Sequence, residues 1–269
     1  MFGSYLALWE LTPDGEPITT DSSRLLPVRQ HGVAAMLKVA VEAEEKFGGV
    51  LMQWWGGQGA ARVPAQEGDA ILLERAEGNA SLAELARNGH DDDASRVVCA
   101  TVAKLHAPRD KPLPDLIPLD QWFRELEPAA NRQGGILSLA AATARELLAA
   151  PQDVGVLHGD IHHGNILDFA ERGWLAIDPK RLIGERGFDY ANLFCNPDLA
   201  GPVHPVATMP GRFMRRVEVV SEAARLERKR LLQWILAWAG LSAAWLLGDD
   251  VSPKTALAGA ELAAMELGH

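Results

Sequence analysis

The chain has 269 residues, of which 48% are hydrophobic, so it has enough apolar side chains for one large domain or two smaller lobes. Its formal net charge of −10 argues against a nucleic-acid partner, because binding to a phosphate backbone depends on patches of Lys and Arg. Cys99 and Cys195 form no CxxC pattern, so the sequence predicts neither a disulfide framework nor a thiolate zinc site. It favours a reducing, cytoplasmic location, and the first residues resemble no export signal.

The first 76 residues are predicted to form strands and turns around one helix. Strands are expected at 5–11 and 32–40, and on both sides of the turn QEGD at 66–69. The segment 41–55 has helical character, with acidic residues at its start. The sequence therefore predicts a small α+β lobe over residues 1–76.

From Ser81 onward the pattern becomes helical. Ser81 and Glu84 form a capping box, and further helices are expected at 91–108, at 119–151 and over most of 212–267. The nearly uncharged segment 231–247 could be mistaken for a membrane span, but its three Trp residues share one helical face. We therefore predict a buried helix, no membrane partner, and a larger, mainly helical lobe over residues 77–269.

Between these helices lies the segment VLHGDIHHGN, residues 156–165, which is rich in polar side chains. One interpretation is a zinc site of a hydrolase, using His158, Asp160 and His162. The adjacent His162 and His163 point apart on any regular backbone, which weakens that interpretation.

The second interpretation depends on a hairpin after the loop. The apolar segments NILDF and WLAID flank a turn, and this places Asn165 beside Asp178 at the end of the second strand. Two oxygen ligands at adjacent strand ends suit Mg²⁺, and Asp160 can then accept a proton from an incoming hydroxyl. The spacing HxD(x4)N followed by a strand-end Asp is typical of phosphoryl transfer.

The motifs HGDIHHGN, IDP and GFDYANLF resemble those of the aminoglycoside phosphotransferases and hydroxyurea antibiotic resistance kinases, above all the streptomycin 6-phosphotransferase subgroup. The resemblance implies a bilobal protein-kinase-like fold of the α+β class, with a small N-terminal antiparallel-sheet lobe containing one helix and a larger helical C-terminal lobe. It also implies ATP and Mg²⁺ as cofactors. The sequence IDP replaces the DFG of protein kinases, and no activation loop follows, which disfavours a protein substrate.

The resemblance also implies roles for individual residues. Asp160 is the catalytic base, Asn165 and Asp178 are metal ligands, and Lys38 holds the nucleotide phosphates with Glu45 as its partner. The remaining positions are expected to support these: Ser22 and Ser23 at the phosphates, Glu74 and Ala76 bonding the adenine through their backbone, and His158 and His162 bracing the loop. Asp189 either stabilises the loop or faces a cationic acceptor, and His163 is expected to be exposed.

The predicted activity is ATP-dependent transfer of the γ-phosphoryl group to a hydroxyl of a small polar molecule, in the manner of a streptomycin 6-phosphotransferase. The acidic body suits a cationic acceptor. Hydroxyurea or another small hydroxylated metabolite stays open as acceptor, as do a zinc-dependent hydrolase and a non-catalytic nucleotide-binding protein. The sequence predicts no oligomeric state.

Overall fold

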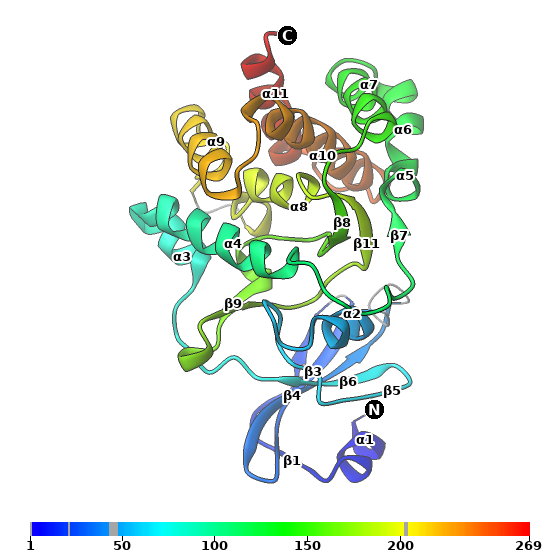
Figure 1. Ribbon diagram of the computed structural model, residues 1–269, viewed down its shortest axis with the longest axis vertical. Helices are drawn as coiled ribbons and strands as arrows, with labels where there is room; N and C mark the ends of the chain where they lie inside the picture. The colour runs from blue at the N-terminus through cyan, green and yellow to red at the C-terminus, as the bar shows by residue number, and fades with distance from the viewer. Residues whose placement is uncertain (1, 21, 43–47, 202–203) are drawn as a thin grey trace.

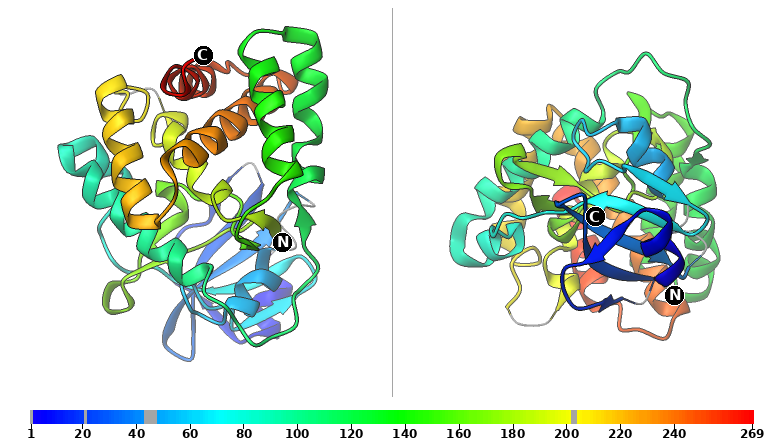
Figure 2. Two further views of the ribbon diagram at one scale, coloured as in Figure 1. Left: turned by 45° about the horizontal axis from the view of Figure 1, so that its top comes forward. Right: turned by 90° about the horizontal axis from the view of Figure 1, so that it is seen from below.

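The computed structural model describes residues 2–20, 22–42, 48–201 and 204–269. An antiparallel sheet built from the N-terminal residues lies at the bottom of Figure 1, with most of the helices above it. Figure 2 shows the same layering after a 45° turn. The predicted arrangement, a small antiparallel-sheet lobe and a larger helical lobe, is confirmed. The boundary after residue 76 stays a prediction.

The sheet of the N-terminal lobe has the strand order β1-β3-β4-β6-β5, with β2 paired to β3. Its strands are β1 (Leu11–Pro13), β2 (Ile18–Thr19), β3 (Ser23–Gln30), β4 (Val33–Ala40), β5 (Ala65–Glu67) and β6 (Ala70–Glu74). The strands predicted at 32–40 and around the turn QEGD are confirmed. Strands β3 and β4 form a hairpin through His31 and Gly32, whose φ angles of 49° and 84° are those of a two-residue turn that matches strand twist.

The strand predicted at 5–11 is wrong, because residues Gly3–Leu8 form helix α1 and only Leu11–Pro13 form a strand. Phe2, Tyr5, Leu6 and Trp9 pack on the outer face of the sheet, against Leu26 and its buried neighbours. Their spacing of three, one and three residues is that of one face of a helix. This helical spacing outweighs the strand propensity of the apolar residues.

Helix α2 (Gly48–Trp55) and the turn after it join the N-terminal lobe to the helical lobe. Trp55 is buried, and its indole Nε1 donates a hydrogen bond to the Leu105 carbonyl oxygen over 3.1 Å. Beyond the turn, the Ala61 amide donates to the Ala176 carbonyl and the Ala176 amide donates to the Gly59 carbonyl, each over 2.9 Å. The N-terminal lobe is thus bonded backbone to backbone to strand β10 (Trp174–Ala176) of the helical lobe.

The larger lobe contains helices in each segment where the sequence predicts them. They are α3 (Leu82–Leu85), α4 (Asp91–Leu105), α5 (Leu119–Trp122), α6 (Leu126–Gln133), α7 (Ile136–Ala149), α9 (Pro210–Ala224), α10 (Arg228–Gly248) and α11 (Lys254–Leu267). The short helix α8 (Phe188–Ala191) is an addition that the sequence does not predict. Ser81 caps α3 as expected, because its hydroxyl oxygen accepts from the Glu84 amide. Short 3-10 or π turns connect them: η2 (Ala86–His90), η3 (Phe123–Glu125), η4 (His163–Asn165), η5 (Ala170–Arg172), η6 (Asn192–Cys195) and η7 (Asp198–Ala200).

Helix α10 is the centre of this lobe and packs against α7 and α11 (Figure 1). Within the described residues it alone is long and apolar enough to cross a membrane, and 72% of its apolar window is buried inside the molecule. Gly240 allows α7 to approach closely, since a Cβ there would lie 2.3 Å from the Ala140 Cβ. This burial fits the predicted core helix.

Two small sheets lie between the N-terminal sheet and the helices, and they position the polar loop. Strands β7 (Ile117–Pro118), β11 (Leu182–Glu185) and β8 (Val154–Leu157) form one sheet, and β8 leads directly into the loop. Strands β9 (Ile166–Asp168) and β10 (Trp174–Ala176) form the predicted hairpin, with Ile166 opposite Ala176. This register brings Asn165 next to Ile177, the residue before Asp178.

Candidate active site

Asp189 of helix α8 anchors the loop that follows β8. The side chain of Asp189 is completely buried. Its carboxylate accepts hydrogen bonds from the backbone amides of His158 and Gly159, at 2.9 and 2.7 Å, and from His106 Nε2 at 2.7 Å. Burial, the largest influence, raises the pKa of Asp189, but the hydrogen bond and charge of His106, with further contributions from His158 and Gly159, lower it below its usual value. Asp189 therefore stabilises the loop, and the alternative that it binds a cationic acceptor is wrong.

Gly159 and His158 set the path of the loop. Gly159 has a φ of +87°, and a Cβ there would lie 2.8 Å from Leu182 Cδ1, so only glycine fits this turn. His158 is buried, its Nδ1 accepts from the Asp160 amide at 3.2 Å, and its Nε2 donates to the Ile177 carbonyl at 2.8 Å. Burial lowers the pKa of His158, which favours this neutral imidazole. The ring also stacks on Trp55, with centroids 6.0 Å apart.

Asp160 and Asn165 face one another across the loop. The Asn165 Nδ2 group donates to the Asp160 carbonyl at 2.9 Å and to Asp160 Oδ2 at 3.2 Å. The Asn165 carbonyl accepts from the Ile177 amide at 2.9 Å. Because the Asn165 side-chain nitrogen is directed at Asp160, its amide oxygen is directed away from Asp160. The Asp160 side chain is 31% exposed, so an acceptor molecule can reach it.

Lys38 of strand β4 reaches Asp178 from the opposite lobe. The Lys38 Nζ lies 2.7 Å from Asp178 Oδ1, and the lysine side chain is 5% exposed whereas that of Asp178 is 29% exposed. The His158–Ile177 and Asn165–Ile177 hydrogen bonds hold the neighbouring backbone. Asp160, Asn165, Asp178 and Lys38 are thus brought together from one loop, one hairpin and the facing sheet.

The donor set fits Mg²⁺ better than Zn²⁺. The Asn165 amide oxygen and the Asp178 carboxylate are the oxygen ligands that Mg²⁺ takes alongside phosphates and water. Both ring nitrogens of His158 are already hydrogen bonded, so it cannot complete the proposed zinc site with Asp160 and His162. Among the described residues, no group of three His, Cys, Asp or Glu is arranged to hold a metal. The zinc-hydrolase alternative therefore lacks its ligands.

The two remaining histidines of the loop have structural positions. His162 Nδ1 accepts from the Gly164 amide at 3.0 Å and so caps η4, which agrees with a bracing role. The expectation that His163 is exposed is wrong, because it is buried, with no hydrogen-bond partner for either ring nitrogen among the described residues. Burial, together with the charge of Arg216, lowers the pKa of His163 well below its usual value. The His163 ring is therefore buried and neutral.

The predicted nucleotide-binding residues of the N-terminal lobe lie in well-defined local structures. The Ser23 amide donates to Thr20 Oγ1 at 3.0 Å, and the Ser22 carbonyl accepts from Val41 and Glu42. The Glu74 amide donates to the Arg62 carbonyl, so only its other backbone group is left for an adenine. The roles of Ser22, Ser23, Glu74 and Ala76 stay predictions. Glu45, the expected partner of Lys38, lies outside the described residues.

A cavity of about 530 Å³ adjoins Asp160. Trp122, Trp238 and Trp245 line it, and the first and last of these meet edge to face at 5.5 Å. The Trp122 Nε1 atom is buried with no hydrogen-bond partner among the described residues. The cavity is also lined by the acidic residues Glu125 and Asp249 and by the basic residues Arg124, Arg132 and Lys180. A polar, partly cationic molecule can therefore be held next to Asp160.

Sequence reasoning missed His106, Trp122 and Asn192, each of which contributes to this site. Asn192 Nδ2 donates to Asp160 Oδ1 at 2.9 Å. Asn192 follows Asp189 by three residues, at the junction of α8 and η6, and this helical spacing puts both side chains on the side that faces the loop. His106 and Trp122 come from distant helices, and no local motif marks them.

Solved structures share this architecture. A choline/ethanolamine kinase family protein from Mesorhizobium loti superposes with a TM-score of 0.67, at 14% identity, over 97% of this chain and 90% of that chain. A thermostable mutant of aminoglycoside phosphotransferase APH(4)-Ia, in a ternary complex with ADP and hygromycin B, superposes with a TM-score of 0.66 at 12% identity, over 97% of each chain. These likenesses show that the chain has a protein-kinase-like fold.

The chain belongs to the aminoglycoside/hydroxyurea antibiotic resistance kinase family, whose family model matches residues 8–250. Streptomycin 3''-kinase of Klebsiella pneumoniae is 55% identical over 241 residues, which cover 90% of both chains. Streptomycin 6-kinase of Streptomyces griseus is 32% identical over 272 residues, covering 96% of this chain and 85% of that protein. The family predicted from the motifs is confirmed.

Proposed function

We propose that this kinase uses ATP and Mg²⁺ to phosphorylate a hydroxyl group of streptomycin. The observation that carries the proposal is the convergence of Asp160, Asn165, Asp178 and Lys38 beside a cavity large enough for a small molecule. Phosphoryl transfer uses a base for the acceptor hydroxyl, ligands for the metal and a lysine for the phosphates. Their joint presence therefore supports catalysis over nucleotide binding alone.

Each group has a distinct role. Asp160 accepts the proton of the acceptor hydroxyl as its oxygen attacks the γ-phosphorus, and the bond to the bridging oxygen breaks with its electron pair leaving on ADP. Lys38 holds the phosphates. Asn165 and Asp178 would hold Mg²⁺, which neutralises phosphate charge when bound. Alignment and electrostatic stabilisation thus account for most of the rate enhancement.

The acceptor is inferred from the relatives and from the cavity. The 55% identity to a streptomycin 3''-kinase supports the 3''-hydroxyl over the 6-hydroxyl that the sequence motifs favoured. Glu125 and Asp249 can pair with guanidinium groups, and the tryptophan faces can stack on them. Glu125 also lies 3.3 Å from Arg124, so a substrate cation would compete with that exposed pair. The cavity therefore suits a cationic sugar.

The test measures ATP consumption with streptomycin and hydroxyurea, and locates the phosphate on the product by NMR. We expect turnover of streptomycin with phosphate at the 3'' position. Phosphate at the 6 position would return the assignment to the original expectation, and turnover of hydroxyurea alone would contradict the proposed acceptor. A chelator should abolish activity, and Mg²⁺ should restore it.

Asp160→Asn tests the catalytic base directly. Phosphorylation should fall by about 10²- to 10⁴-fold, because the amide cannot accept the proton, while binding of ATP stays near the wild-type value. Asp93→Asn, at an exposed position of helix α4, is the matched control. Full activity of the Asp160→Asn enzyme would remove Asp160 from its role.

A further inference from the structure

The carboxylate of Asp160 is held by two side-chain amides, one on each oxygen. Asn165 Nδ2 donates to Oδ2 at 3.2 Å, and Asn192 Nδ2 donates to Oδ1 at 2.9 Å. Asn165 is also the expected metal ligand, whereas the side chain of Asn192 has no part in the proposed metal or nucleotide sites. Its contact with Asp160 therefore calls for a separate explanation.

The amide of Asn192 is fixed in one orientation by its neighbour Asn196. Asn196 Nδ2 donates to Asn192 Oδ1 at 2.7 Å and to the Asn192 carbonyl at 3.2 Å. Rotating the Asn192 amide by half a turn would bring two NH₂ groups together and present an oxygen to the Asp160 carboxylate. Both contacts would be repulsive, so the donor stays directed at Asp160. Both asparagines are buried, at 4% and 5% exposure.

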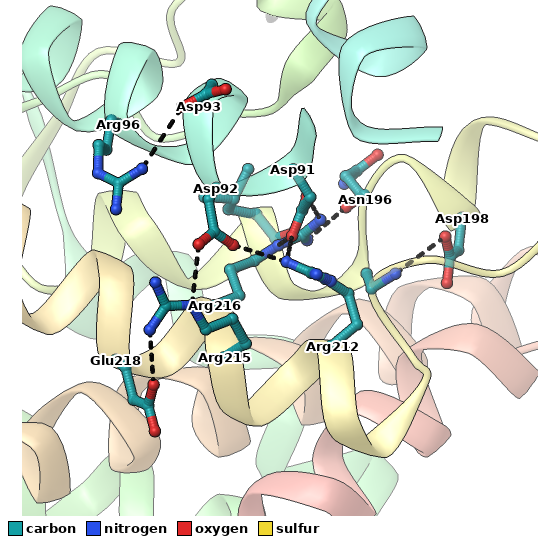
Figure 3. A network of polar contacts seen from close by, with 12 residues as sticks. Asp91, Asp92, Asp93, Arg96, Asn196, Asp198, Arg212, Arg215, Arg216 and Glu218 are labelled. Atoms are coloured by element: carbon teal, nitrogen blue, oxygen red, sulfur yellow. Dashed lines mark hydrogen bonds and ion pairs between the residues drawn. The ribbon is translucent and has the colours of Figure 1, made fainter. Parts of the chain in front are cut away.

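Asn196 is itself held by Arg216, which is completely buried on helix α9. Arg216 Nη1 donates to the carbonyls of Asn196, at 2.7 Å, and of Leu193. Its other nitrogens pair with Asp91 at the start of helix α4. Figure 3 shows Arg216 between Asp91 and Asn196, with Arg212 and Arg215 of the same helix directed at Asp91 and Asp92. A buried ion pair thus fixes the backbone that carries both asparagines.

We propose that Asn192 is a positioning residue for Asp160. It fixes the rotation of the Asp160 carboxylate, so that one of the two lone pairs not used by the amides faces the acceptor hydroxyl in the cavity. Each carboxylate oxygen can accept two hydrogen bonds, so the amides leave room for the substrate. The inference depends on the proposed role of Asp160 as base, and it adds Asn192 as the residue that orients the carboxylate of this base.

Asn192→Asp separates positioning from packing. The variant keeps the size of the side chain and the oxygen that accepts from Asn196, but replaces the donor facing Asp160 by a carboxylate oxygen. We expect kcat for streptomycin to fall by about 10- to 100-fold, because a misaligned base loses near-attack geometry. The KM values for ATP and streptomycin should change by less than about threefold, as expected when only the transition state is affected.

Three further variants complete the experiment. Asn88→Asp, at an exposed position, is the control for the added charge and should behave as wild type. Asn196→Asp alters the support of Asn192 without touching Asp160, and should lower kcat less than Asn192→Asp. Asn192→Ser introduces no charge and cannot span the gap to Asp160, so it should reproduce the loss of kcat.

The outcomes distinguish this inference from the proposed function. A wild-type kcat in either folded Asn192 variant would overturn the positioning role, as would a loss of ATP binding equal to the loss of kcat. Failure of both Asn192 variants to fold, judged by their melting transitions, would overturn it in favour of a purely structural role. Full activity of Asp160→Asn in the same assay would overturn the proposed function instead.

Discussion

The two sides of the active site are held in place by different means. On the helical side, buried polar side chains fix the backbone of the catalytic loop. Asp189 and His158 bond the three successive amides of residues 158–160, and His158 also bonds the Ile177 carbonyl. On the sheet side, Lys38 is placed by the backbone pairing of β4 between β3 and β6. Substitutions on the helical side should therefore affect folding and catalysis together, whereas substitution of Lys38 should affect catalysis alone.

Asp189→Asn should have the largest effect on stability. The variant directs an NH₂ group at backbone amides and breaks a buried ion pair with His106, which costs about 3–5 kcal/mol of unfolding free energy. Denaturant titration at neutral pH measures this loss. Asp153→Asn, which breaks the exposed pair with Arg186, is the control and should cost under about 1 kcal/mol.

Asp189 also makes the unfolding free energy depend on pH in the acid range. Because the folded-state pKa of Asp189 is lowered, its contribution is complete above the unfolded-state pKa of about 3.9 and is lost as the pH falls through the lower folded value. The wild-type unfolding free energy should therefore drop more steeply in this range than that of Asp189→Asn. Parallel acid titrations would contradict the anchoring role.

Lys38→Ala tests the sheet side. Loss of the ammonium group should lower kcat by about 10²- to 10³-fold and raise the KM for ATP, as when one charge-stabilising donor is removed. The melting temperature should change little, because backbone pairing holds β4. Lys254→Ala, at an exposed position, is the control. Global unfolding of Lys38→Ala would break the distinction between the two sides.

His163→Leu should change the pH dependence of stability on the helical side. The pKa of folded His163 lies well below its usual value, so below pH 6.5 or so the unfolded chain binds a proton that the folded chain does not. Below the unfolded-state pKa, each such histidine lowers the unfolding free energy by up to about 1.4 kcal/mol for every unit by which the pH falls. The variant should lose this slope for one group, and denaturant titrations at a series of pH values measure the difference.

Trp122→Phe should have the smallest effect, confined to the acceptor. Replacing the indole by a smaller ring should raise the KM for streptomycin by about fivefold, because this wall of the cavity beside Asp160 loses apolar contact area, and should leave the KM for ATP unchanged. Trp174→Phe, on the hairpin strand β10, is the control. An unchanged KM for streptomycin would show that the acceptor does not contact Trp122.

The catalytic side was largely predictable from sequence, because its groups lie within one loop and one hairpin. The spacing of Asp160, Asn165 and Asp178 predicts their proximity from local strand pairing alone. Asp189 was left with two open roles, since only the packing of helix α8 under the loop reveals its burial. His163 was assigned to the surface for the same reason: the sequence does not say which of two adjacent side chains turns inward.

Contributions that come from distant helices could not be predicted in this way. His106 and Trp122 reach the site through the packing of α4 and α5, and the Asp91–Arg216 pair joins residues 125 positions apart. Residues Gly3–Leu8 were predicted as part of a strand because the strand propensity of the apolar residues was given more importance than their helical spacing. Local patterns thus identify chemical groups, whereas tertiary packing decides how firmly they are held.

The paired backbone bonds between Gly59, Ala61 and Ala176 restrict how the two lobes can separate. A rotation that opened the molecule at this point would have to break both of them, and would also unstack Trp55 from His158. Any motion of the lobes that preserves these bonds must therefore pivot about this point.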